Sequence, residues 1–136
     1  MYTNKLNDLK SSNNTSVNFN KIGNLNLSRI IFITSRGSAS ASELIINNLT
    51  PYTQVVIIGD NTFGKPVGSF PLSRYNRTLL DNNVELVPIT FATANAQGKA
   101  EYFDGFPANY QVGDSPQFPW GDQRDLRLAA ALQYIQ

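Results

Sequence analysis

The sequence contains no cysteine and no histidine among its 136 residues. These two absences exclude a Ser-His-Asp triad, a Cys-His dyad, a zinc site built from cysteine and histidine, and a redox-active CxxC pair. A nucleophile in this chain must therefore be a serine, threonine, lysine, tyrosine or carboxylate. A base that works near neutral pH must be a lysine, aspartate or glutamate whose pKa is shifted.

Charge is also scarce, since charged residues make up 15% of the chain and the net charge is +1. Without a basic cluster, neither nucleic acid nor an anionic membrane surface is an expected partner. No apolar run reaches the roughly 18 residues that could span a bilayer, and no signal-peptide pattern is present. With 41% hydrophobic residues, the chain is expected to form a globular domain with its own core.

The first 27 residues are rich in Asn, Ser and Lys and are expected to be a partial N-terminal segment or connector. Within them, the sequence predicts a short helix over Met1–Lys10 and a loop or disordered stretch over Ser11–Ser16. The folded domain is expected to cover residues 28–136.

Two apolar runs, Ser28–Thr34 and Gln54–Asp60, have the composition of strands buried on both faces. Between them, Ala39–Leu49 is expected to be a helix that ends before Pro51. Within this segment Ala41, Leu44, Ile45 and Leu49 recur at helical spacing. The order predicts a βαβ unit with parallel strands, and hence an α/β fold.

After Pro66 the pattern changes to a β-hairpin region, with predicted strands over Val67–Leu72 and Val84–Thr93. Pro88 favours a sheet edge or a bulge in the second strand. A C-terminal helix is predicted over Asp122–Gln136, with Asp122 as its N-cap. The predicted inward residues of this helix are Leu126, Ala129, Ala130, Leu132 and Ile135.

The stretch Gly37–Glu43 (GSASASE) lies where the first predicted strand turns into the helix. Ser40 would then sit at a helix N-terminus, where outward-pointing backbone N–H groups can hold an oxyanion. The same residues also match a capping box, with a hydroxyl at Ser40 and a carboxylate three residues later at Glu43. Both interpretations, catalytic nucleophile and structural cap, remain open from this stretch alone.

Lys65 comes after the second predicted strand and has a competing interpretation. Gly59–Lys65 matches the GxxxxGK pattern of a phosphate-binding loop, but the next residue is Pro66. Proline offers neither the hydroxyl for Mg²⁺ nor the backbone N–H that such a loop needs, which argues against a nucleotide site. A single lysine in a loop is also commonly just solvated.

Ser40 and Lys65 are predicted to lie close together. Both would lie at the carboxyl edge of neighbouring parallel strands, about 4.8 Å apart, where a lysine can reach a serine oxygen. A lysine acts as a base when burial lowers its pKa from about 10.4 towards 7–8, and an apolar neighbour such as Phe63 would help. The sequence therefore predicts a Ser-Lys dyad.

The motifs Ser38–Glu43 (SASASE) and Val56–Lys65 (VIIGDNTFGK) resemble the catalytic core of the S41 peptidases, the C-terminal processing or tail-specific proteases. The resemblance continues more weakly through Pro88–Thr90 and Asp104–Pro107. It implies that Ser40 is the nucleophile and Lys65 the base of a serine endopeptidase, with the Ala41 N–H in the oxyanion hole. It also implies a crotonase-like or ClpP-like α/β core, no cofactor or metal, and an extracytoplasmic location, periplasmic or cell-surface, in a bacterium. The implied substrate is an unstructured or C-terminal polypeptide segment.

The sequence departs from the family pattern in three ways. Ser69 stands where many members have a glutamine that orients the lysine. Residues 1–36 contain no Asn-x-Gly-Gly stretch, whose glycine supplies a second oxyanion donor, and there is no PDZ domain. We therefore expect the C-terminal part of a larger catalytic domain, with little activity alone. The alternative is a non-catalytic pseudo-protease module that binds peptides by strand addition. Exposed sheet edges would also favour association into homo-oligomers.

Overall fold

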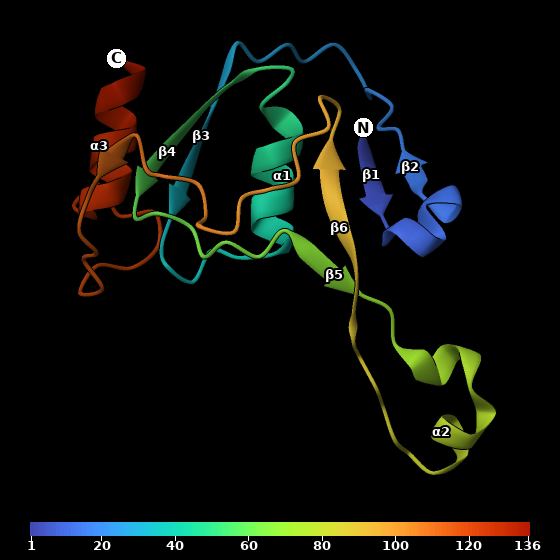
Figure 1. The fold of residues 1–136 in the computed structure, drawn as a ribbon. Helices are drawn as coiled ribbons and strands as arrows, with labels where there is room; N and C mark the ends of the chain where they lie inside the picture. The colour runs from blue at the N-terminus through green and yellow to red at the C-terminus, as the bar shows by residue number, and fades with distance from the viewer.

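The computed structural model describes all 136 residues and shows a mixed α/β fold (Figure 1). Its strands are β1 (Tyr2–Lys5), β2 (Thr15–Val17), β3 (Arg29–Thr34), β4 (Gln54–Gly59), β5 (Val67–Ser69), β6 (Ile89–Asn95) and β7 (Tyr110–Gln111). Its helices are α1 (Ala41–Leu49), α2 (Arg77–Asp81) and α3 (Leu126–Ile135), with 3₁₀ turns η1 (Asp8–Asn13) and η2 (Leu72–Tyr75). No helix has the length and hydrophobicity needed to cross a bilayer.

The predicted βαβ unit is confirmed. Strands β3 and β4 are parallel and in register from Arg29 opposite Gln54 to Thr34 opposite Gly59. The short strand β7 adds to the other side of β4, also parallel, and gives the sheet order β3-β4-β7. This register places the carboxyl ends of β3 and β4 side by side, as the prediction of a shared site requires.

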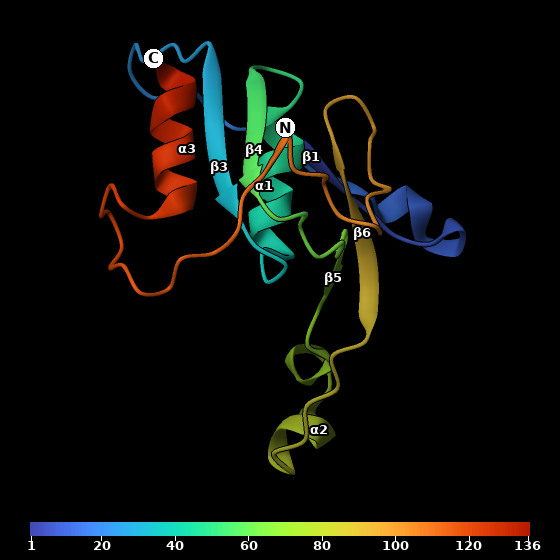
Figure 2. The ribbon, with the colours of Figure 1, turned by 90° about the vertical axis from the view of Figure 1, so that its left-hand side faces the viewer.

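Helices cover this sheet on both faces, with α1 on one and α3 on the other (Figure 2). On the α1 side a core cluster contains Ile46, Ile57, Tyr102 and Phe106; on the α3 side a second cluster contains Val56, Ile58 and Ala131. Successive residues of β4 thus alternate between two cores, which confirms its predicted burial on both faces. The same prediction for Ser28–Thr34 is wrong: only Thr34 of β3 is buried and Ile33 is 43% exposed, because β3 lies at the edge of the sheet.

A second, antiparallel sheet has the order β2-β1-β6-β5. The helix predicted over Met1–Lys10 is wrong, because Tyr2–Lys5 pairs with Ala92–Asn95 of β6 instead. The predicted helix had only two leucines to bury, and Leu9 is 91% exposed, so pairing along β6 outweighs a weak helical preference. The predicted loop over Ser11–Ser16 instead contains the end of η1 and the start of β2.

The predicted hairpin is present, but its strands β5 and β6 are shorter and shifted. The register slips between Gly68 and Ser69, where Ser69 faces Ile89, the residue after Pro88, in agreement with the predicted irregularity. Residues 70–88, which hold η2 and α2, project from the body as an arm (Figures 1 and 2). No residue of the arm is buried, so it lacks a core of its own.

The apolar residues spaced along α1 are not its buried face. Its buried residues are Glu43, Ile46, Asn47 and Asn48, whereas Ile45 is 52% exposed. Glu43 and Asn47 tolerate burial because they are bonded: Asn47 donates to the Lys99 carbonyl at 2.8 Å, and the Asn95 amide donates to Asn47. The buried Oδ1 of Asn48, in contrast, has no hydrogen-bond partner. Hydrophobic periodicity cannot anticipate a face that is stabilised by such contacts.

The C-terminal helix α3 differs from its prediction in the same way. It begins at Leu126, and its N-cap is Asp125, whose carboxylate accepts the Leu128 N–H at 2.8 Å; the predicted cap Asp122 lies outside it. The predicted inward residues Leu126, Leu132 and Ile135 are 53%, 36% and 53% exposed. Instead Arg127 and Ala131 are buried, because Arg127 pairs with Asp60 at the end of β4 at 2.8 Å.

Candidate functional site

Ser40 occupies the sharp turn between β3 and α1. It is the N-cap of α1, is exposed, and has φ 54° and ψ −109°, a left-handed conformation that is rare for a residue other than glycine. Ordinary N-cap residues lie in the β region, so this geometry costs about 1–3 kcal/mol beyond what capping requires. A strained, exposed serine on a strand-to-helix turn has the form of a nucleophile elbow.

The fully buried carboxylate of Glu43 connects Ser40 to the Lys65 loop. Its Oε2 accepts the Ser40 N–H at 3.0 Å and the Lys65 N–H at 2.8 Å. Its Oε1 accepts the Thr62 hydroxyl and the Gly64 N–H, both at 2.6 Å. The predicted capping interaction is therefore present, but the carboxylate also fixes the second loop against the first. The sequence motif predicts only the helix cap, whereas in the structure Glu43 also holds the Lys65 loop next to Ser40.

Residues 103–106, which the sequence motifs did not assign to the site, hold the Lys65 loop from the other side. Thr62, fully buried, donates its N–H to the Phe106 carbonyl at 3.0 Å and accepts the Phe106 N–H on its hydroxyl at 2.7 Å. A Cβ on Gly64 (φ 97°) would lie 2.1 Å from the Phe103 carbonyl oxygen, and one on Gly105 (φ 78°) 2.2 Å from the Thr62 carbonyl oxygen. The loops thus pack backbone against backbone, and only glycine fits at both positions.

The side chain of Lys65 is exposed, and Phe63 is 64% exposed beside it. The prediction that Phe63 helps to bury the lysine is therefore wrong for this chain: the site is an open surface. A lysine base needs a dry environment, so a bound polypeptide would have to provide much of the desolvation.

The residues after Lys65 exclude a phosphate-binding loop. Pro66 leads into strand β5, whereas such a loop must open a helix. In addition, the N–H groups of Gly64 and Lys65 already donate to Glu43 and cannot hold a phosphate.

Ala41, the predicted oxyanion donor, is the first residue of α1 and is exposed. Its N–H belongs to the first turn, where helix geometry leaves backbone donors without an internal partner and the helix dipole favours negative charge. Ser69, at the position of the family glutamine, is the half-buried last residue of β5. The chain presents no cluster of three or more carboxylates that could hold a metal ion.

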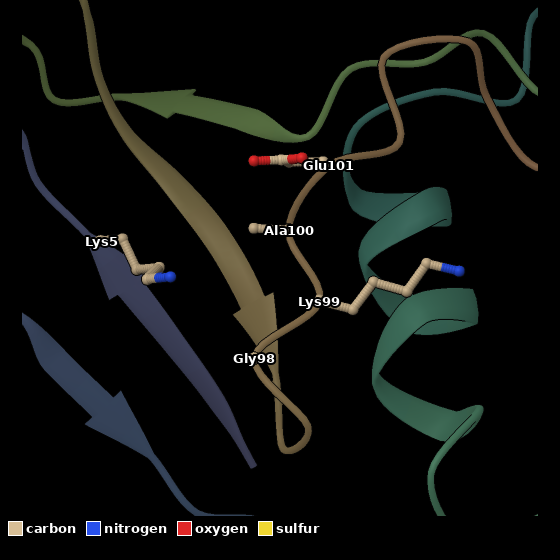
Figure 3. A pocket seen from close by; sticks show the side chains of 5 residues that line it. All are labelled: Lys5, Gly98, Lys99, Ala100 and Glu101. Carbon is tan, nitrogen blue, oxygen red and sulfur yellow. The ribbon is translucent and has the colours of Figure 1, made fainter.

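Two cavities lie away from Ser40 and Lys65. One of about 310 Å³ is lined by Lys5 and residues 98–101, and there the Lys99 side chain points away from Lys5, towards α1 (Figure 3). Its lining contains no serine, threonine or tyrosine. The other, of about 680 Å³, lies between α1 and residues 18–27, and its lining includes Leu44, Ile45 and Leu49, which explains the apolar stripe of α1. Neither cavity provides the chemistry that the sequence predicts.

Comparison with known proteins agrees with the motifs. A model of peptidase family S41 matches residues 2–90. The structure is similar to the crystal structure of a Bacteroides fragilis protein assigned to the S41 proteases, with a TM-score of 0.83 and 28% sequence identity. The similarity covers 98% of this chain and 36% of the other, so this chain spans little more than a third of that protein's length. No curated protein matches the sequence.

Proposed function

Because the chain belongs to peptidase family S41, we propose that it carries the nucleophile and the base of a serine endopeptidase, Ser40 and Lys65. The substrate is a polypeptide, cleaved in an unstructured or C-terminal segment. Residues 28–136 form the C-terminal part of the catalytic domain, of crotonase-like architecture, and residues 1–27 a partial N-terminal segment. The protein acts outside the cytoplasm of a bacterium, which a reporter fusion in the source organism would test.

In the proposed mechanism, neutral Lys65 accepts the proton of the Ser40 hydroxyl as Oγ attacks the scissile carbonyl carbon. The Ala41 N–H stabilises the oxyanion of the tetrahedral intermediate. The C–N bond then breaks, the protonated lysine gives its proton to the leaving amine, and an acyl-enzyme remains on Ser40. Water, deprotonated by Lys65, hydrolyses the ester and restores both side chains.

The observation that carries this proposal is the shared oxygen of Glu43. Ser40 and Lys65 lie in different loops, 25 positions apart, yet both backbone N–H groups donate to Oε2 of one buried carboxylate. This contact holds the backbones of Ser40 and Lys65 to one atom and, with the left-handed conformation of Ser40, supports their proposed roles as nucleophile and base. A structural cap would need neither the strain nor the second loop.

Chemical labelling of Ser40 tests the proposal. A fluorophosphonate reacts with activated serines without needing a long substrate, and mass spectrometry identifies the labelled residue. We expect label on Ser40, its loss in Ser40→Ala, and labelling at least about 100-fold slower in Lys65→Ala, the usual contribution of a general base. Ser42→Ala, at an exposed serine in the first turn of α1, is the matched control. Equal labelling of Ser40→Ala and the unmodified chain would contradict the assignment.

Turnover of peptides by this chain alone is expected to be slow, because Ala41 is the one oxyanion donor that the sequence motifs supply. A second candidate function is suggested by the exposure of Lys65: a pseudo-protease module that binds peptides without cleaving them. Peptide binding that persists after Lys65→Ala, with no labelling of Ser40 in the unmodified chain, would favour this alternative.

A further inference from the structure

Strand β5 begins two residues after Lys65 and is an outer strand of its sheet, bonded only to β6. In both views of the ribbon it starts close to the end of α1 that carries Ser40 (Figures 1 and 2). A free sheet edge presents backbone donors and acceptors to any extended chain that lies along it. This edge therefore runs directly out of the candidate active site.

The hydrogen-bond pattern of the hairpin shows which groups of β5 are free. The Thr93 N–H donates to the Pro66 carbonyl at 3.0 Å, so Pro66 faces β6. In an antiparallel pair, successive residues of a strand point their N–H and C=O alternately towards the partner strand and away from it. The N–H and C=O of Val67, opposite Ala92, therefore point away from β6. Those of Gly68, opposite Phe91, point towards it. The outward donor and acceptor nearest to Lys65 along β5 are thus those of Val67.

One face of this edge is aromatic. A Cβ on Gly68 would lie 2.2 Å from the Phe91 ring, so the ring covers the strand where a side chain is missing. The Phe70 ring packs against Phe91 at 4.7 Å between centroids and is 38% exposed. A strand added about 4.8 Å beyond β5 would place its side chain next to Gly68 within reach of these rings. The edge therefore suits an apolar side chain at that position.

The other sheet edges are less suited to this role. Strand β2 lies at the opposite end of the same sheet, and β7 has only two residues. Strand β3 ends at Thr34, and the whole loop 35–39 separates it from Ser40. Only β5 brings a free strand edge immediately after the proposed base.

We propose that the free edge of β5 receives the polypeptide substrate as an added strand, with its backbone paired to Val67 N–H and C=O and an apolar side chain beside Gly68 against Phe91. The inference rests on the proposed function, because it takes the occupant to be that enzyme's substrate. Backbone pairing holds an extended chain whatever its sequence, and the aromatic face adds a preference at one position.

Binding of a labelled peptide to the Ser40→Ala chain tests this mode apart from catalysis. The probe is a fluorescein-labelled, extended decapeptide with valine at alternate positions, and its binding is followed by fluorescence anisotropy. Val67→Pro removes the outward N–H but no bond to β6, so it should weaken binding about tenfold, equivalent to one or two hydrogen bonds. Val67→Thr keeps the N–H and the β-branched shape, and should bind within about twofold of the parent.

Two further measurements do not depend on the folding of the proline variant, and one of them tests the preference for an apolar side chain beside Gly68. In the Ser40→Ala chain, peptide binding should slow hydrogen exchange of the Val67 amide, and a peptide with aspartate in place of valine should bind more weakly. Equal binding by Val67→Pro and Val67→Thr, an unprotected Val67 amide, or equal affinity for the two peptides would overturn the inference. If Ser40 labels normally while Val67→Pro binds like Val67→Thr, the docking mode fails and the proposed function stands. If Ser40 does not label while Val67→Pro weakens binding, the docking mode stands and the proposed catalytic function fails.

Discussion

Ser40 and Lys65 are held by the same atom, since the N–H of each donates to Oε2 of Glu43, at 3.0 and 2.8 Å. The side chains of Ser40 and Lys65 take no part in this contact. The contact therefore positions the two backbones through groups other than the proposed reactive side chains.

Replacing Glu43 should disrupt both the fold and the site. In Glu43→Gln an amide N–H₂ replaces one acceptor oxygen and faces the donors that now bond to it. We expect a loss of about 2–4 kcal/mol in the free energy of unfolding, measured with urea, and much slower labelling of Ser40. The exposed Glu101→Gln is the control, and a stable, normally labelled Glu43→Gln would show that the shared oxygen is dispensable.

Alanine at Gly64 should separate the two loops that pack around Thr62. A Cβ there would lie 2.1 Å from the Phe103 carbonyl oxygen, on a backbone with φ 97°. Because backbone atoms cannot move aside cheaply, we expect at least about 2 kcal/mol of destabilisation and a displaced Lys65. Gly113→Ala, with open space around its Cβ, should change stability by less than about 0.5 kcal/mol in the same urea titration.

The buried guanidinium of Arg127 should account for much of the docking of α3. It donates to the Asp60 carboxylate at 2.8 Å and to the Val112 carbonyl at 3.1 Å, and its side chain is 9% exposed. Arg127→Ala should lower the free energy of unfolding by about 2–3 kcal/mol, because a packed stem is lost and a carboxylate is left unpaired. Arg124→Ala, which breaks an exposed pair with Asp122, should cost much less stability. Similar losses of unfolding free energy for both variants would contradict the larger contribution expected from the buried Arg127.

Acid should weaken the cap of α3. The Leu128 N–H, and then the Ser115 hydroxyl, lower the pKa of the Asp125 carboxyl below its ordinary value of 3.8. A lowered pKa in the folded state contributes stability above pH 3.8, and this contribution disappears as the pH falls through the lowered value. Asp125→Asn should therefore show a shallower loss of thermal stability in circular dichroism between about pH 5 and pH 2. An unchanged slope would contradict the role of this carboxylate.

The sequence was sufficient for features that depend on local pattern. Two apolar runs around a helical segment predicted β3, α1 and β4, and parallel pairing then placed the ends of both strands together. The turn that exposes Ser40 and the loop of Lys65 were located from two short motifs. These features depend on residues close in sequence, whose composition already constrains the backbone.

Features that depend on distant partners were not predictable in this way. Glu43 and Asn47 face the core of α1 because acceptors and donors from residues 62–65, 95 and 99 meet them there, and no periodicity records such partners. Tyr2–Lys5 becomes a strand because β6 offers a partner about 90 residues later, outweighing its local preference. The same reasoning applies to Arg127, which looks like a solvated helix position until Asp60 is placed beside it.

The contact between Thr62 and Phe106 has a consequence for protein synthesis. The loop that carries Lys65 is completed by residues 44 positions later in the chain. During translation, Ser40 and Lys65 leave the ribosome well before the segment that holds their loop in place. Since domains fold as their chain emerges, the site can become organised only after residue 106 is available. The candidate site therefore becomes organised only after the segment that contacts the Lys65 loop has been synthesised.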